Sequence, residues 1–150
     1  METTESVEHG ADAGLGNLLG IQPAMTPAAY ASADALFAKL AGYLDDAGRR
    51  GWVGPRTIAV FPEYIGTWLV VDGKSRSVQL ALTEGQAWRK HALARRIARS
   101  GARHGINVFL RGALWDLGSD GLSLMVSDGV ATETGADGAA LLNLWLPGEE

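Results

Sequence analysis

The chain has 150 residues, a formal net charge of −4 and no cysteine. Its length suits one domain with a sizeable core, and the absence of cysteine excludes disulfides, a thiolate nucleophile and cysteine metal sites. The negative charge disfavours a nucleic-acid or anionic-membrane partner, and no apolar run approaches the roughly 18 residues of a membrane-spanning helix.

Residues 1–14 are acidic and small and show no periodicity, so we expect a disordered leader there. They lack the basic and apolar pattern of an export signal, which indicates a cytoplasmic location. Residues 15–150 are expected to form a single domain of the α/β class.

A strand, a helix and a second strand are predicted in that order. Residues 15–23 form a short apolar run closed by proline, which is typical of a central strand. The Thr26-Pro27 pair supplies an N-cap and a first helical residue. Apolar residues follow at helical spacing, and Gly51 is a signal for the end of the helix. Residues 56–62 form the next apolar run, so the order predicts a right-handed parallel crossover unit.

The chain beyond this unit is expected to form a helix and then a run of short strands. Turn residues interrupt an apolar stretch and indicate a seam near residues 73–84. Residues 83–100 predict a helix with one apolar side. The remainder predicts an antiparallel meander over residues 106–115, 122–127 and 139–146.

Arginines cluster on the other side of this second helix. They are Arg89, Arg95, Arg96, Arg99 and Arg103. Such a stripe can bind phosphate groups with salt-dependent affinity, but only Trp88 accompanies it and the rest of the chain is acidic. A solvated face or a subunit contact is the simpler interpretation, and phosphate binding stays an alternative.

Glu63 is the candidate catalytic residue. It follows a predicted buried strand, and α/β folds keep their chemistry at the carboxyl ends of strands. Beside Tyr64 and Trp68 its carboxylate would be partly desolvated, which suits a general base near neutral pH. The spacing also fits a solvated or salt-bridged loop glutamate, and structural carboxylates outnumber catalytic ones.

Two blocks of the chain resemble the carbon-nitrogen hydrolase family, the nitrilase superfamily. Residues 17–23, the following helix and residues 60–68 are similar to the amino-terminal part of that family, and residues 82–145 are similar to the end of some bacterial members. The resemblance implies a layered α/β sandwich with Glu63 as the general base. The family also uses an oxyanion-stabilising lysine and a cysteine that attacks the nitrile or amide carbon, and neither has a matching segment. The chain therefore resembles an internally shortened member that lacks the catalytic middle near residues 73–84.

No other side chains are expected to replace the missing nucleophile. The available hydroxyl and imidazole groups belong to Ser100, Ser119, Ser123, Ser127, His91 and His104. None of the serines lies in a nucleophile elbow, so we do not expect a serine triad. Lys74 and Lys90 fall in a turn and on a helix, and solvated positions suit them better than an oxyanion site.

No pattern predicts a metal or a cofactor. His9, His91 and His104 show no metal spacing. The loop from Asp116 lacks ligands that a calcium loop requires, and the glycines near Gly14 fail the dinucleotide fingerprint.

Two functional hypotheses follow. The first is a carbon-nitrogen hydrolase homologue, with an ancestral nitrile or amide ligand, that keeps Glu63 and is inactive alone. The second is a non-enzymatic interaction or regulatory module that assembles with itself or with a full-length relative. Self-association is expected because a shortened sheet exposes edges and apolar faces, for which Trp68, Trp115 and Trp145 are candidates.

Overall fold

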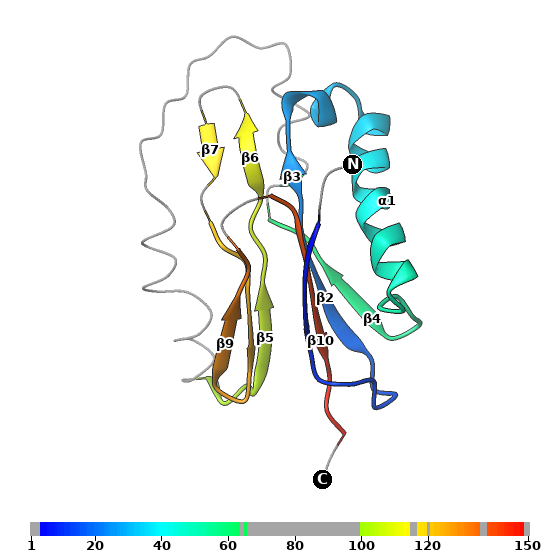
Figure 1. Ribbon diagram of the computed structural model, residues 1–150, viewed down its shortest axis with the longest axis vertical. Coiled ribbons are helices and arrows are strands. Elements are labelled where there is room, and N and C mark those ends of the chain that lie inside the picture. The colour runs from blue at the N-terminus through cyan, green and yellow to red at the C-terminus, as the bar shows by residue number, and fades with distance from the viewer. Residues whose placement is uncertain are drawn as a thin grey trace.

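The computed structural model describes residues 4–63, 65, 100–114, 117–119, 121–135 and 138–148. Its helices and strands follow one another along the chain as Figure 1 shows. They are β1 (Glu5–His9), β2 (Asn17–Gln22), β3 (Ala24–Met25), the 3₁₀ helix η1 (Pro27–Tyr30), α1 (Ala33–Arg49), β4 (Thr57–Val60), β5 (His104–Asn107), β6 (Arg111–Leu114), β7 (Leu117–Ser119), β8 (Leu124–Ser127), β9 (Val130–Glu133) and β10 (Ala140–Trp145).

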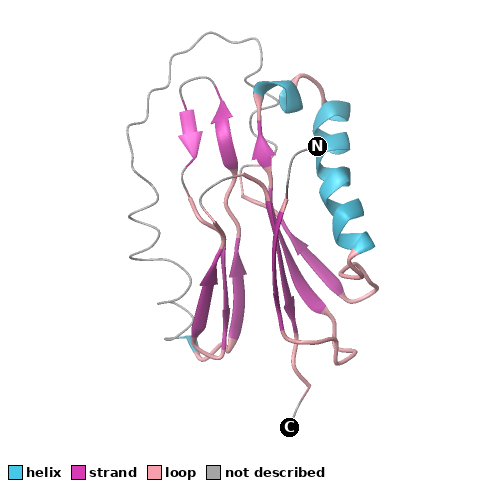
Figure 2. Ribbon diagram, viewed as in Figure 1, coloured by secondary structure: helices cyan, strands magenta, loops and turns pink. Residues whose placement is uncertain are grey.

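The described strands form three sheets. The main sheet has the order β1-β10-β2-β4, in which β10 is parallel to β1 and antiparallel to β2, and β4 is parallel to β2. The second sheet, β5-β8-β9, is antiparallel, and a small sheet joins β3, β6 and β7. Helix α1 covers one face of the main sheet and the second sheet lies on the other side (Figure 2). The layers are therefore helix, sheet and sheet, and the predicted α/β class is confirmed.

An apolar core fills the space between α1 and the main sheet. Leu19 and Ile21 of β2 and Leu141 of β10 pack against Tyr43 and Ala47 of α1. Because successive side chains of a strand point to opposite faces, the residues between these pack on the other side of the sheet. The strand β2 is consequently buried on both faces, as its near-continuous apolar sequence predicted.

A second core lies between the two larger sheets. Leu142 and Leu144 of β10 pack there with Val108 and Met125. Gly20 of β2 lets the sheets approach closely, because a Cβ atom at this position would lie 2.8 Å from Val108 Cγ1. A larger residue at this position would push the two layers apart.

The parallel strand-helix-strand unit is confirmed, but its helix begins later than predicted. Pro27 starts the short helix η1, and α1 begins at Ala33. The physical reason is a second cap, because Ser32 Oγ accepts a hydrogen bond of 3.0 Å from the backbone N–H of Ala35. The helix ends at Arg49, and Gly51 follows with φ of +78°.

The predicted disordered leader, residues 1–14, contains a strand. Residues 5–9 form β1, which pairs along its length with β10. Val7 packs against the core between the sheets. Composition gave no sign of this strand, because its hydrogen-bonding partner lies at the other end of the chain.

The predicted meander is wrong in its last member. The strand expected over 139–146 forms as β10, but it pairs with β1 and β2 and not with a strand of the second sheet. The strand expected over 106–115 is divided into β5 and β6. The predicted turn at Asp128 and Gly129 is present, with φ of +49° and +82°, and it joins β8 to the unpredicted β9.

Two of the predicted features fall on residues that the structure does not describe. The seam near 73–84 and the helix predicted over 83–100 lie outside the described residues, except for Ser100. Among the helices that are described, none is long and apolar enough to cross a membrane.

Candidate functional site

Glu63 lies just beyond the carboxyl end of β4. Gly20 of β2 is paired with Val60 of β4 in parallel register, so both strands end at the same edge of the main sheet. The chain turns there, with the backbone N–H of Ile65 donating a hydrogen bond of 3.2 Å to the carbonyl of Pro62. The position thus agrees with the predicted edge of the sheet, as α/β sites require.

The Glu63 side chain is exposed, which differs from the partly desolvated carboxylate that the sequence suggested. The aromatic residues expected beside it, Tyr64 and Trp68, lie outside the described residues. An exposed turn holds a carboxylate loosely, whereas acid–base catalysis requires the carboxylate to be held at a fixed position.

Gln22 ends β2 at the same edge and is fully buried. Its Oε1 atom accepts hydrogen bonds of 3.1 Å from the backbone N–H of Ser123 and from Thr134 Oγ1, and its Nε2 atom donates one of 3.0 Å to the carbonyl of Gly138. Both amide atoms are therefore occupied within the protein. Gln22 fastens β2 to the segments that flank the second sheet, so its role is structural.

Tyr30 is the polar residue of a nearby apolar cluster. Met25 and Leu36 are buried with it, and Ile65, two residues after Glu63, packs against the cluster. The Tyr30 hydroxyl has no hydrogen-bond partner among the described residues. Burial raises the pKa of Tyr30 to about 12, so the hydroxyl stays protonated at neutral pH.

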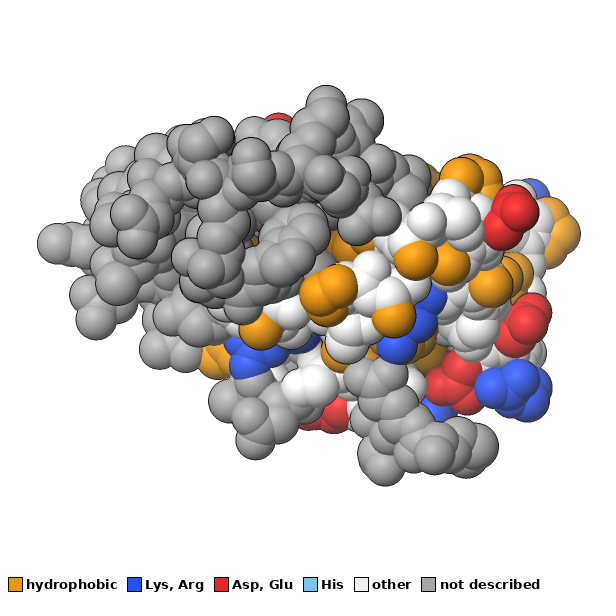
Figure 3. All heavy atoms as spheres, turned by 90° about the horizontal axis from the view of Figure 1, so that it is seen from above, with side chains coloured by type: hydrophobic (Ala, Val, Ile, Leu, Met, Phe, Trp, Pro, Cys, Tyr) orange, Lys and Arg blue, Asp and Glu red, His pale blue; other side chains and the backbone are white. Residues whose placement is uncertain are grey.

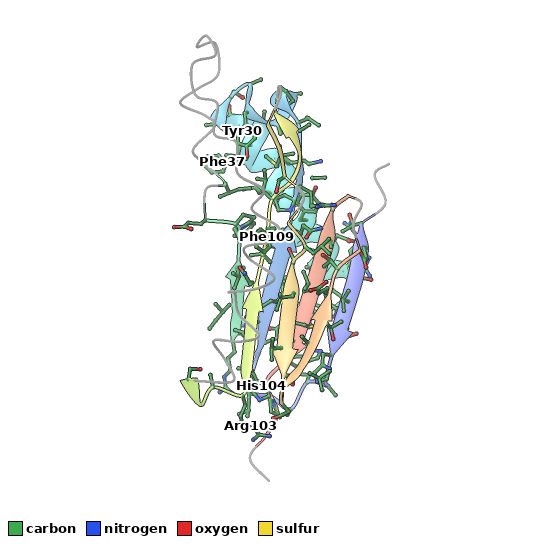
Figure 4. The ribbon with its side chains drawn as sticks, turned by 90° about the vertical axis from the view of Figure 1, so that its left-hand side faces the viewer. Tyr30, Phe37, Arg103, His104 and Phe109 are labelled. Atoms are coloured by element: carbon green, nitrogen blue, oxygen red, sulfur yellow. The ribbon has the colours of Figure 1, made fainter. Side chains whose placement is uncertain are left out.

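A histidine and a serine considered as substitutes for cysteine do meet. His104 of β5 is the register partner of Ser127 of β8, and His104 Nδ1 lies 3.1 Å from Ser127 Oγ. Beside this pair, Arg103 Nε donates a hydrogen bond of 2.7 Å to Asp128 Oδ1. Figure 4 places Arg103 and His104 at the end of the molecule opposite to Tyr30.

The pair lacks the features of a nucleophile and its base. The Ser127 side chain is 6% exposed, so its hydroxyl is not presented to a substrate. No third group among the described residues orients the His104 imidazole, as nucleophilic catalysis requires. The contact is best explained as a cross-strand hydrogen bond.

The other sequence candidates occupy structural positions or lie elsewhere. Ser123 Oγ accepts a hydrogen bond of 2.8 Å from the backbone N–H of Phe109, and Ser100 Oγ accepts one of 3.2 Å from that of Ala102. Ser119 belongs to β7 and His9 to β1. The candidates outside the described residues are His91, Lys74, Lys90, Trp115, Arg89, Arg95, Arg96 and Arg99.

No metal site is found in the part of the chain that the structure describes. No group of three or more histidine, aspartate or glutamate side chains there is arranged to hold an ion. Asp46, for example, is held by salt bridges to Arg49 and Arg50.

Sequence reasoning missed a polar site at β1. Glu8 Oε1 accepts hydrogen bonds from the indole Nε1 of Trp145 at 2.8 Å, the indole Nε1 of Trp52 at 3.1 Å and the amide Nδ2 of Asn143 at 3.4 Å. We call these three donors the Glu8 cradle. They lie 44 or more residues from Glu8 in the sequence, so no local pattern predicts them.

Comparison of the chain with models of known protein families, with curated proteins and with solved structures gives no match. The resemblance to carbon-nitrogen hydrolases therefore stays a prediction.

Proposed function

We propose that this protein is a catalytically incomplete relative of the carbon-nitrogen hydrolases, which keeps the position of the general base and does not carry out the family's reaction. The observation that supports the proposal is the place of Glu63, at the carboxyl end of β4 and beside the parallel strand β2. The helix, sheet and sheet layers are compatible with a reduced form of the layered sandwich that the resemblance implies.

The missing chemistry follows from the sequence. Hydrolysis of a nitrile or an amide by this family requires a thiol that attacks the carbon after a base removes its proton, and the chain contains no cysteine. Proton removal by Glu63 alone forms no bond to carbon. The exposed position of Glu63 also leaves water free to solvate its carboxylate, which weakens any electrostatic role.

An interaction module is the second candidate function, because apolar groups are exposed on the fold. Ile58 is 59% exposed on β4, whose outer edge has no partner among the described strands, and Phe37 of α1 is 66% exposed. Hydrophobic side chains are also visible on the face seen from above (Figure 3). Unpaired strand edges and exposed apolar side chains favour association with another chain.

An ammonia-release assay tests the first proposal. The purified protein is incubated with a panel of aliphatic and aromatic nitriles and amides, beside an active nitrilase and an active amidase as positive controls. We expect no ammonia above the buffer background from the protein or from its Glu63→Gln variant. Turnover by the protein that the variant loses would overturn the proposal.

A further inference from the structure

The strand β1 is attached to the protein along one side. It lies at the edge of the main sheet, and among the described strands it pairs only with β10, from Glu5 opposite Ala140 to His9 opposite Leu144. Each of its residues is 135 positions away from its partner in the sequence, because β10 is the last of the described strands. β1 is thus an edge strand whose pairing partner, β10, comes from the far end of the sequence.

Four successive residues of β1 have their own contacts. Glu5 Oε2 accepts a hydrogen bond of 2.8 Å from the backbone N–H of Gly135, and Ser6 Oγ accepts one of 3.0 Å from Arg50 Nη1. Val7 packs against the core between the sheets, and Glu8 occupies its cradle. Backbone pairing together with side-chain sites is the recognition mode of a peptide that adds a strand to a sheet edge.

The loop over residues 10–16 connects β1 to β2 around the end of β10. The backbone N–H of Leu146 donates a hydrogen bond of 3.0 Å to the carbonyl of Gly16, and Gly10 lies against Trp145. Gly10, Gly14 and Gly16 have φ of +82°, +77° and +97°. Glycine adopts positive and negative φ with similar ease, so this loop can follow a second path at low cost.

The acceptor site for β1 depends on β10. Because β10 separates β1 from the rest of the main sheet, this site is complete only when β10 is paired with β2. Until then, β1 and the outer edge of β10 are both unpaired. An unpaired edge is open to the same strand of any other copy that is present.

We propose that β1 is an exchangeable strand and that the outer edge of β10, with the Glu8 cradle, is its acceptor, so that two copies of this chain can exchange β1 reciprocally. The occupant is the segment Glu5–His9 of a second copy, because it makes every contact that β1 makes within its own chain. The exchanged dimer differs from two monomers in the path of residues 10–16 and in the entropy of association. Exchange of an identical element is a low-cost route to dimers.

Cysteine pairs test the exchange directly, because the chain has no cysteine of its own. One chain carries Ser6→Cys with an affinity tag, and an untagged chain carries Arg50→Cys; both positions are exposed. The two chains are unfolded together, refolded at increasing concentration and treated with a short bismaleimide. The new cysteines lie side by side only when Ser6 of one chain is docked on the body of the other.

We expect a mixed covalent dimer whose fraction rises roughly tenfold with a tenfold rise in concentration while monomers dominate, as mass action requires. A matched partner with Phe37→Cys, exposed on α1 about 20 Å from Arg50 by helix geometry, should give no such product. Chains mixed after separate refolding should also give none at short times. Absence of the mixed dimer at every concentration, or equal yields with Arg50→Cys and Phe37→Cys, would overturn the proposal.

A competing peptide tests whether the mixed dimer forms through the edge of β10. A synthetic peptide with the sequence of residues 4–11, present during refolding, should occupy the edge of β10 and lower the yield of mixed dimer. The same peptide with Glu8→Ala loses the hydrogen bonds of the cradle, so about tenfold more of it should be needed. Equal potency of the two peptides would show that the cradle does not select the strand.

Discussion

Asn17 of β2 and Asn143 of β10 are joined by a hydrogen bond of 2.5 Å between their buried side chains. Asn17 Nδ2 also donates a hydrogen bond of 2.8 Å to the carbonyl of Trp52, and Asn17 Oδ1 accepts one of 2.7 Å from Thr57 Oγ1. One side chain therefore connects β2, β4 and β10 with the segment after α1. Since Asn143 also donates to Glu8, this network extends to β1.

Substitution of Asn17 by leucine should strongly destabilise the fold. The Trp52 carbonyl, the Thr57 hydroxyl and the Asn143 side-chain oxygen would each lose a hydrogen bond, and a typical hydrogen bond contributes about 0.5–1.5 kcal/mol to stability. We expect a loss of about 2–3 kcal/mol in the free energy of unfolding, measured by urea denaturation.

Two further variants control this result. Asp45→Asn on the exposed side of α1 should change stability by no more than about 0.5 kcal/mol. The double variant Asn17→Leu, Asn143→Leu should lose less than the sum of the single variants, because each single variant already breaks the hydrogen bond between the two side chains and the double variant loses it only once. Strict additivity would show that the two asparagines are not coupled.

Gly20→Ala should destabilise the contact between the two larger sheets. The added Cβ would lie 2.7 Å from Ile106 Cδ1, and overpacking of this kind costs about 1–3 kcal/mol. Ile106→Val removes that methyl group and should partly rescue the variant in a double-mutant cycle.

Gly42→Ala provides the matched control for this prediction. It lies within α1 with nothing inside 4 Å of an added Cβ. Because alanine is the better helix former, stability should rise by about 0.5–1 kcal/mol. Equal effects at Gly20 and Gly42 would contradict the close sheet packing.

Tyr30→Phe should stabilise the protein by about 1 kcal/mol, because it removes a buried hydroxyl that has no partner among the described residues. The pKa of Tyr30 is raised from 10.0 to about 12 by burial. Because the pKa of Tyr30 is higher in the folded than in the unfolded state, the unfolded state loses this proton first. The parent protein therefore keeps its full free energy of unfolding below about pH 10 and loses part of it as the pH rises toward 12. The advantage of Tyr30→Phe over the parent should therefore widen in this range, measured by thermal unfolding. A destabilised Tyr30→Phe would reveal a hydrogen bond to this hydroxyl.

The elements that the sequence predicted are those specified by neighbouring residues. The strand β2 and the apolar face of α1 follow from local periodicity, and the order of β2, α1 and β4 made a parallel unit predictable. The strand β1 and the position of β10 could not be predicted in this way. Each depends on a partner more than a hundred residues distant, which leaves no local signal.

The candidate site likewise has features that local sequence predicts and features that depend on distant residues. That Glu63 lies at a strand end followed from the order of elements alone, whereas its exposure depends on which segments cover that edge. The Glu8 cradle was beyond prediction, because Trp52, Asn143 and Trp145 meet Glu8 only through the folded sheet. The contact of His104 with Ser127 likewise requires the register of β5 against β8.

Gln22 and Glu63 end neighbouring strands at one edge of the main sheet, and substitutions should separate their roles. Gln22→Leu removes three hydrogen bonds and leaves the buried Ser123 N–H and Thr134 hydroxyl without this partner, so we expect a loss of about 2–4 kcal/mol. Glu63→Gln alters an exposed turn and should change the free energy of unfolding by no more than about 0.5 kcal/mol. Urea denaturation of both variants measures the difference. If Glu63→Gln were as destabilising as Gln22→Leu, the carboxylate would be anchored in the fold, and its exposed position would be refuted.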